Sequence, residues 1–337
     1  MANGRFLAFG EILLRLSPPG RKLFLQSSQL DVWVGGAEAN VATALARLGH
    51  STAIASALPD NALGDAALAQ LRAAGTDTTG VLRRGNRIGL YFVTPGAGLR
   101  ATEVFYDRAN SAFAETPADH WNWSELLAGA DRIHLSGITP ALGPTGRTSA
   151  LAAAQTACEL GVPVSFDGNY RALLWEAWDG QPQATLRTLV DHSDLFFGNC
   201  RDLSLILGET FSGTTRQERR QAAEAAFKAF PRCQLIASTI REVVSTDEHR
   251  VAARIDTVDR GFESEFKTIS GITDRIGAGD AFAAGVLHEQ RRGGAIEEMA
   301  ETGLALTCLK HGLPGAASLF DQRELDAFKA GRLDVRR

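Results

Sequence analysis

The chain has 337 residues, a formal net charge of −4 and 45% hydrophobic residues, which is the composition of a globular protein with a sizeable core. The slightly acidic balance gives no reason to expect nucleic-acid binding. The four cysteines are widely spaced and form no CxxC pair, so neither a zinc site nor a disulfide framework is indicated. No apolar stretch approaches the ~20 residues that a bilayer requires. We therefore expect a cytoplasmic protein with no membrane partner.

The N-terminal part of the chain alternates between predicted strands and helices. Apolar periodicity predicts, in chain order, a strand at 5–10, a half-exposed strand at 11–16, a helix at 41–48, a strand at 52–58 and a helix at 65–74. Gly49 and Gly75 follow the two helices, in the position where glycine commonly ends a helix.

Residues 81–108 interrupt this alternation. Two strand-like runs, 88–93 and 102–106, flank a hairpin-type loop at 95–98. The pattern predicts a small sheet separate from the main one, which strands within 11–34 could join.

Regular alternation resumes after residue 131. The pattern predicts strands at 132–136, 162–167, 195–198 and 234–238, a β region at 242–266, and helices at 149–160, 183–191, 201–207, 216–230, 280–292, 295–311 and 322–330. Strand–helix alternation implies an α/β fold with a parallel sheet covered on both faces. Ligands of such sheets bind at the carboxyl ends of the strands, where Asp167, Asn199, Ser238 and Thr239 fall. No repeat or linker divides residues 1–337, so we expect one domain.

A glycine-rich turn near the C-terminus is the strongest chemical signal. Gly277 and Gly279 flank Ala278, and Asp280 then opens a helical run. Backbone N–H groups at a helix N-terminus form an anion site, typically for phosphate. Asp280 beside that site could accept a proton from an attacking hydroxyl, and the helix dipole should keep it ionised. A simple turn with an aspartate helix cap would give the same letters.

A second glycine motif lies near the N-terminus. Gly35, Gly36 and Ala37 allow a ligand to approach the backbone, and Glu38 and Asn40 bring polar side chains to a helix start. Such groups suit a polyol. A turn with an asparagine cap is the simpler alternative.

Together, in this order and spacing, the two motifs resemble the two signatures of the ribokinase (PfkB-type) carbohydrate kinases. The resemblance covers almost the whole chain. It implies a ribokinase-like αβα sandwich with a mainly parallel central sheet and a small β-sheet lid, formed from about 11–34 and 87–108, over the sugar. It also implies ATP and Mg²⁺ as cofactors, leaves open a monovalent cation such as K⁺, and suggests a homo-oligomer formed through the lid.

Three further stretches resemble the 2-keto-3-deoxygluconate kinases within this family: 166–171 (FDGNYR) followed by Leu174-Trp175, 106–112 (YDRANSA) and 310–315 (KHGLPG). The resemblance implies transfer of the ATP γ-phosphoryl group to the 6-hydroxyl of 2-keto-3-deoxygluconate. It adds Tyr91, Tyr106, Arg108 and Arg171 to the substrate-binding residues. The substrate carboxylate would need a cation in a closed site, and an arginine fork suits it.

The same resemblance assigns a nucleotide pocket. It would contain Asn199, Ser238, Thr239, Cys308 and His311, beside Gly277 and Gly279. The NxxE element that the family ties to magnesium is here Asn199-Cys200-Arg201-Asp202. Aspartate is one methylene shorter than glutamate, so Asn199 and Asp202 are expected to act on the metal indirectly.

Three other functions are alternatives to this one. A fructokinase or another sugar kinase on the same fold is the close alternative. A non-catalytic sugar sensor would have no need of Asp280. A dinucleotide-dependent oxidoreductase is excluded because Gly10-Glu11 after the first strand is not a GxGxxG turn opening a helix.

Overall fold

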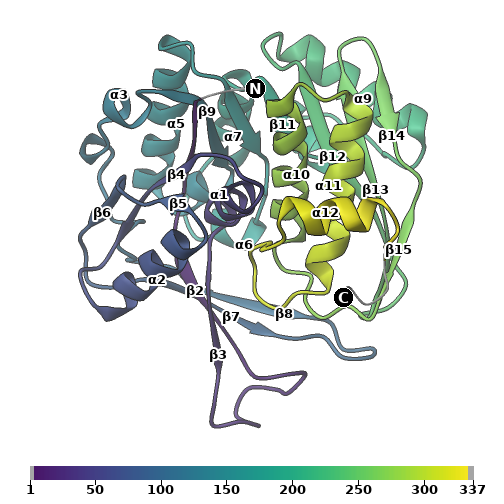
Figure 1. Cartoon of the computed structure of the whole chain (residues 1–337). Coiled ribbons are helices and arrows are strands. Elements are labelled where there is room, and N and C mark those ends of the chain that lie inside the picture. Colours follow the sequence, from purple (N-terminus) through teal and green to yellow (C-terminus); the bar gives the residue numbers. More distant parts are fainter. Residues whose placement is uncertain (1–3, 333–337) are drawn as a thin grey trace.

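The computed structural model describes residues 4–332, which form two β-sheets and the helices around them (Figure 1). The mixed α/β architecture, with one large and mainly parallel sheet and one small separate sheet, confirms the predicted fold class. Within residues 4–332, none of the helices has the length and apolar character needed to span a membrane.

The large sheet runs in the order β14-β13-β12-β11-β10-β9-β1-β4-β5, with β15 paired to β13 and β6 to β4. Pairing is parallel from β12 through β5, and β13 pairs antiparallel with β12, β14 and β15. Its strands are β1 (Arg5–Phe9), β4 (Thr52–Leu58), β5 (Thr76–Asp77), β6 (Val81–Arg83), β9 (Ala130–Ser136), β10 (Val164–Asp167), β11 (Leu195–Phe197), β12 (Leu235–Val243), β13 (Glu248–Thr257), β14 (Gly261–Glu263) and β15 (Lys267–Ser270).

Helices cover both faces of this sheet because its central strands are apolar on both sides. In β1, Phe6 and Ala8 face one core, and Leu7 and Phe9 face the other. The first core is covered by α1 (Ala37–Arg47), α2 (Ala62–Ala73), α10 (Ala278–Arg292) and α11 (Ile296–His311), with α12 (Gln322–Lys329) packed outside them. The second is covered by η1 (Ala118–His120), α3 (Trp123–Leu126), α4 (Ile138–Ala141), α5 (Pro144–Glu159), α6 (Ala172–Trp175), α7 (Pro182–Asp191), α8 (Cys200–Leu207) and α9 (Arg216–Ala229).

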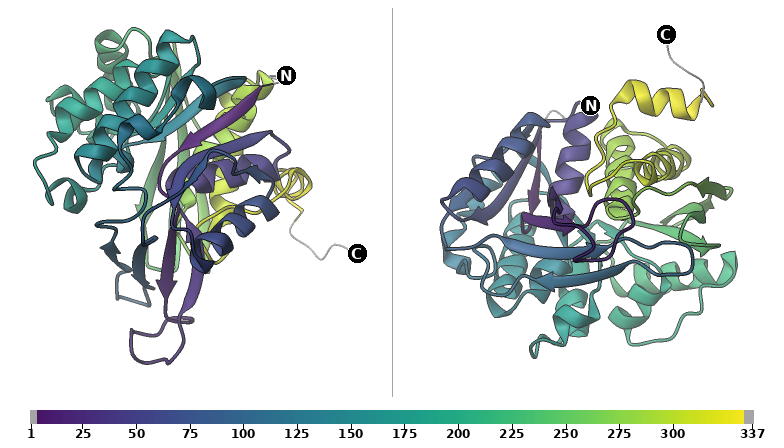
Figure 2. Two further views of the ribbon diagram at one scale, coloured as in Figure 1. Left: turned by 90° about the vertical axis from the view of Figure 1, so that its left-hand side faces the viewer. Right: turned by 90° about the horizontal axis from the view of Figure 1, so that it is seen from below.

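The small sheet, called the lid sheet below, contains the four strands β3 (Asp31–Gly35), β2 (Leu13–Ser17), β7 (Gly89–Thr94) and β8 (Glu103–Asp107), in this order. It projects away from the large sheet in Figure 1 and in the left view of Figure 2. Strand β2 pairs parallel with β7, and the two outer pairs are antiparallel. The predicted strands at 88–93 and 102–106 therefore lie where the sequence placed them, within a separate sheet.

Ion pairs fix the lid sheet to the rest of the molecule. Arg15 of β2 pairs with Asp274, which immediately precedes the glycine-rich turn, and both side chains are buried. Arg108, directly after β8, pairs with Glu11 through Nε at 2.6 Å. The base of the lid sheet is thus joined to the segment that carries the predicted anion site.

The structure differs from the predicted elements mainly at their ends. Helix α1 begins at Ala37 rather than 41, and α10 begins at Ala278, before the predicted start. Strand β12 continues to Val243 because it pairs along its whole length with β13. The predicted β region at 242–266 resolves into β13 and β14, which extend the sheet antiparallel at this edge.

Candidate active site

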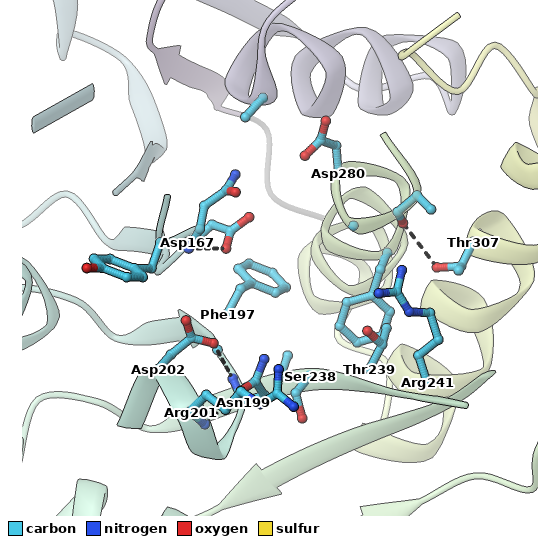
Figure 3. Close-up of a pocket in the computed structure, with 18 of the residues that line it drawn as sticks. Asp167, Phe197, Asn199, Arg201, Asp202, Ser238, Thr239, Arg241, Asp280 and Thr307 are labelled. Atoms are coloured by element: carbon cyan, nitrogen blue, oxygen red, sulfur yellow. Dashed lines mark hydrogen bonds between the residues drawn. The ribbon is translucent and has the colours of Figure 1, made fainter. Parts of the chain in front are cut away.

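A cavity of about 1160 Å³ lies over the carboxyl ends of β10, β11 and β12, beneath the lid sheet. Figure 3 shows charged and polar side chains entering it from several elements, with Phe197 of β11 between them. Strand β10 ends at Asp167, and β11 leads into Asn199. The parallel topology brings these positions together, as expected for an α/β sheet.

The glycine-rich turn forms one wall of the cavity. Gly277 is the N-cap of α10 and has φ +82°, a left-handed conformation that suits glycine. A Cβ at Gly277 would also lie 1.7 Å from the carbonyl oxygen of Ala316. Gly279 lies within the first helical turn, has no left-handed φ, and faces open space. Gly277 therefore makes the turn possible, and Gly279 keeps the helix N-terminus open to an approaching anion.

Asp280 connects the two predicted motifs. Its Oδ2 accepts a hydrogen bond of 2.6 Å from Nδ2 of the buried Asn40, 240 residues away in the chain. Burial raises the pKa of Asp280 to about 6, although the Asn40 bond and the positive charges of Arg171 and Lys310 oppose the shift. Burial is therefore the main influence on the protonation of this carboxylate, beside any effect of the helix terminus.

The N-terminal motif contributes fewer ligands than expected. Gly36, Ala37 and Asn40 line the cavity. Gly36 has φ +137°, and a Cβ there would lie 2.3 Å from the carbonyl oxygen of Glu11. Gly35 is buried at the end of β3 and is absent from the lining.

The prediction that Glu38 binds the sugar does not agree with its position, because its side chain does not line the cavity. Its carboxyl is buried and accepts a 2.6 Å hydrogen bond from the Ser136 hydroxyl. Burial raises the pKa of Glu38 to about 7. Glu38 therefore connects α1 to β9 within the protein interior and offers no group to a polyol in the cavity.

The lid side of the cavity carries aromatic rings and a buried arginine. Tyr91 and Tyr106 lie on adjacent strands with ring centroids 6.5 Å apart, and both line the cavity. Arg108 also lines it, while its Nε pairs with Glu11, which accepts a second bond from Ser111. Among residues 4–332, no protein hydrogen bond is made by the two Nη groups of Arg108. These groups are therefore available to a ligand.

The sheet side carries a second arginine, Arg171, just after β10. Its exposed side chain lines the cavity and bonds only the carbonyl of Tyr170, at 3.1 Å, in the described part of the chain. Asn169, two residues earlier, adopts φ +36° and also lines the cavity. Burial raises the pKa values of Asp167, Asp202 and Asp280, and the charge of Arg171 opposes each rise, so the guanidinium lies near all three carboxyls.

Four aspartates line the same cavity, and one of them, Asp256, is paired with Arg254. Figure 3 shows Asp167, Asp202 and Asp280 entering it from different elements. Burial raises the pKa of Asp167 to about 8, and the charges of Asp280 and Asp202 raise it further. A cation would relieve this repulsion, so the donor set fits Mg²⁺. Between residues 4 and 332, no three His, Cys, Asp or Glu side chains gather closely enough to hold a metal by themselves. This suits Mg²⁺, which keeps several waters and binds few carboxylates.

Asn199 and Asp202 have a structural role in addition. They form a capping box at the start of α8, in which Asp202 Oδ2 accepts the Asn199 N–H at 2.8 Å. One carboxylate oxygen of Asp202 is thereby occupied. The other predicted nucleotide residues Ser238, Thr239 and His311 line the cavity with Asn199. Cys308 does not; it packs half-buried against the core, and burial raises its pKa to about 11.

Comparison of the sequence with known families identifies the family of this protein. The sequence model of the pfkB family of carbohydrate kinases matches residues 6–323. The chain is a member of this family. It is therefore a carbohydrate kinase, as the two glycine motifs predicted.

Three relatives are notable. A 2-dehydro-3-deoxygalactonokinase of Haloferax volcanii is 31% identical over 330 residues, covering 98% of each chain. A 2-dehydro-3-deoxygluconokinase of Bacillus subtilis is 28% identical over 302 residues, covering 86% of this chain and 84% of the relative. The crystal structure of a 2-dehydro-3-deoxygluconokinase from Thermotoga maritima superposes with a TM-score of 0.92 at 36% identity, covering 98% of this chain and 100% of that one.

The structure of this kinase adds residues to the site that sequence reasoning left out. Arg241 and Arg275 both line the cavity, and each makes no ion pair within residues 4–332. The charge of Arg275 and burial both lower the pKa of Arg241. Two neighbouring guanidinium groups without a carboxylate partner attract an anion. Arg275 stands inside the glycine motif, and this position was the signal that could have identified it.

Proposed function

We propose that this kinase transfers the γ-phosphoryl group of ATP to the 6-hydroxyl of a 2-keto-3-deoxy sugar acid, with 2-keto-3-deoxygluconate as substrate and its 6-phosphate as product. The observation that carries the substrate class is the position of Arg171. This guanidinium enters the same cavity as Asp280 and has no carboxylate partner among the described residues. A sugar acid would bring a carboxylate to that charge, which a neutral sugar lacks. The names of the relatives support a substrate of this class.

Two of the cavity's arginines, Arg171 and Arg108, would bind the acid end of the substrate. Arg171 approaches from the sheet side, and Arg108 presents its Nη groups from the lid side. A carboxylate entering this cavity would exchange water for charge-assisted hydrogen bonds, which offset the cost of its desolvation. Tyr91 and Tyr106 would cover the carbon chain between the two ends.

Asp280 would act as the general base at the opposite end of the sugar. As the 6-oxygen forms its bond to the γ-phosphorus, the bond from phosphorus to the β,γ-bridging oxygen breaks, and the hydroxyl proton passes to Asp280. A pKa near 6 leaves Asp280 ionised at neutral pH, ready to accept that proton. The bond from Asn40 would orient the carboxylate. The N–H groups at Gly277, Ala278 and Gly279 would stabilise the charge on the transferring phosphoryl group.

ATP would lie along the ends of β11 and β12. Ser238, Thr239 and His311 would contact the nucleotide, and Arg241 and Arg275 its phosphates. Asn199 and Asp202, with Asp167, would hold Mg²⁺ largely through water. Bound there, Mg²⁺ would neutralise phosphate charge.

The lid sheet would also form the contact between two copies of this chain. Phe105 and Val32 of the outer strands are 68% and 56% exposed, and Leu25 and Leu99 in the adjoining loops are nearly fully exposed. Apolar side chains gathered on one sheet commonly mark an interface. Molar mass by light scattering should show a dimer that Phe105→Glu weakens.

The experiment that tests the substrate is an assay of ADP release across matched sugars. The panel contains 2-keto-3-deoxygluconate, its galactonate epimer, fructose and ribose, and NMR of the product locates the phosphate. We expect the highest kcat/KM for one of the two keto-acids and a 6-phosphate product. Preference for fructose would replace this proposal by the fructokinase alternative.

A further inference from the structure

Lys310, near the end of α11, is a buried cation that the proposed mechanism leaves unused. Its side chain has 0% exposure. The ammonium group donates to the carbonyl oxygen of Leu313 at 2.8 Å and to that of Asp274 at 3.4 Å. No carboxylate of residues 4–332 lies within ion-pair distance of it. Burying an ammonium group without a direct counter-ion is costly, so its presence at this place calls for a role.

The ammonium lies directly behind the glycine-rich turn. Asp274, whose carbonyl it binds, opens the segment that runs to Gly277. The carboxylate of Asp274 pairs with the buried Arg15 and also accepts the N–H groups of Gly315 at 3.1 Å and Ile276 at 3.0 Å. Two buried cations, Arg15 and Lys310, therefore converge on the residue that begins the turn.

These contacts bear on the monovalent cation that the family resemblance left open. A K⁺ ion is held by oxygen atoms, typically backbone carbonyls, that replace its hydration shell. At this turn the carbonyls of Asp274 and Leu313 already accept from Lys310, and the carboxylate of Asp274 accepts from Arg15 and two backbone N–H groups. The oxygens behind the turn thus have N–H partners from the chain itself and do not fit a K⁺ ion.

We propose that Lys310, assisted by Arg15, is a built-in cation that supports the phosphate-binding turn, so that this kinase needs no monovalent metal ion for turnover. Lys310 is a positioning residue: it holds the carbonyl groups of the segment before Gly277 and places a positive charge behind the turn. The same charge lowers the pKa of Asp280, which helps to keep that carboxylate ionised. The inference rests on the phosphate-binding role proposed for Gly277 to Gly279.

The first test uses the parent enzyme alone. Turnover of 2-keto-3-deoxygluconate is measured with magnesium and the tetramethylammonium salt of ATP, in either KCl or tetramethylammonium chloride at equal ionic strength. We expect kcat to agree within about twofold, because the required charge is covalently attached. A loss of more than about tenfold without K⁺ would overturn the inference.

The second test removes the ammonium group while keeping the length of the side chain. Lys310→Met is compared with Lys329→Met, a matched control whose half-exposed ammonium donates to Thr302 on the outer side of α11. In tetramethylammonium chloride, kcat of Lys310→Met should fall by about 10²-fold, as for other losses of fixed electrostatic support. NH₄⁺ or K⁺ should restore part of it, since either can enter the vacated carbonyl site. The control should keep parent kcat in every salt.

Melting temperatures supply a readout that does not depend on substrate. NH₄⁺ should raise the Tm of Lys310→Met relative to tetramethylammonium, and should leave the parent and Lys329→Met unchanged. A folded Lys310→Met with parent kcat in tetramethylammonium, or with a loss that no small cation restores, would contradict the inference. If the variant does not fold, the salt comparison on the parent decides. Absence of keto-acid phosphorylation in every salt would instead refute the proposed substrate and leave the melting comparison valid.

Discussion

The lid side and the sheet side of the cavity hold their arginines differently. On the lid side, Arg15 and Arg108 are buried and paired with Asp274 and Glu11. On the sheet side, four arginines of the cavity have no carboxylate partner among the described residues, namely Arg171, Arg201, Arg241 and Arg275, whereas Arg219 and Arg254 pair with Glu263.

The paired arginines therefore have a structural role, whereas the unpaired arginines are available to bind a ligand. A buried ion pair is fixed before any ligand arrives, and removing one partner leaves the other charge uncompensated. An arginine without a partner remains hydrated until an anion displaces its water. Substitutions on the lid side should therefore affect stability as well as binding, whereas those at the four unpaired sheet-side arginines should affect the binding of anionic ligands alone.

The largest effect is expected at Asp280, where the two sides meet. Asp280→Asn should lower kcat by about 10²–10⁴, because the general base is lost, with little change in sugar KM. The parent kcat/KM should fall as pH drops through about 6, since protonation removes the base. Asp119→Asn, an exposed control, should match the parent. Turnover of Asp280→Asn within about threefold of the parent would remove Asp280 from the mechanism.

Arg108→Ala should break an ion pair on the lid side, and should reduce both substrate binding and stability. Binding of the keto-acid should weaken by roughly 2–5 kcal/mol, as for truncating one member of a buried charge pair. The melting temperature should fall as well, because Glu11 is left buried without its cation. Kinetics and thermal melting of the same sample check both effects. An unchanged Tm would place Arg108 with the sheet-side arginines.

Arg241→Ala tests the effect of removing an unpaired arginine on the sheet side. The KM for ATP should rise by the equivalent of roughly 1.5–3 kcal/mol, the range for a hydrogen bond to a charged group. The sugar KM and the Tm should not change, because Arg241 has no ion-pair partner in the described chain to leave behind. Arg323→Ala, on the exposed start of α12, is the control. Equal loss of ATP and sugar binding would argue against a phosphate contact.

The smallest predicted effect is the change in thermal stability caused by Asp167→Asn. The folded-state pKa of Asp167, about 8, lies above its ordinary value of 3.8, so the folded protein holds this proton more tightly than the unfolded chain does. Its contribution to stability is therefore lost as pH rises from about 4 to about 8. Asparagine should raise Tm at pH 8, on the order of 2–4 °C, and less at pH 5. A higher gain at pH 5 would reverse the sign of this argument.

The sequence predicted the architecture well because the signals involved are local. Hairpin-forming residues at 95–98 and alternating strands beside them sufficed to predict the lid sheet. The antiparallel edge at β13 and β14 was harder to predict because it depends on pairing with the long β12.

The orientation and pKa values of the site residues were harder to predict where they depend on burial in the folded chain. Glu38 looks like a ligand in the sequence, but its partner Ser136 lies 98 residues away and keeps it inside the protein. The pKa of Asp280 depends mainly on its burial in the folded chain, which the local sequence does not show. The bond between Asn40 and Asp280 likewise exists only in the folded chain.

The most direct test of the sugar-acid assignment measures kcat/KM for 2-keto-3-deoxygluconate and for fructose, in the parent enzyme and in Arg171→Ala. The parent should prefer the acid. The variant should lose roughly 2–5 kcal/mol of apparent binding for the acid, much less for fructose, and keep the parent Tm. Parent preference for fructose, or equal loss on both substrates in the variant, would contradict the account.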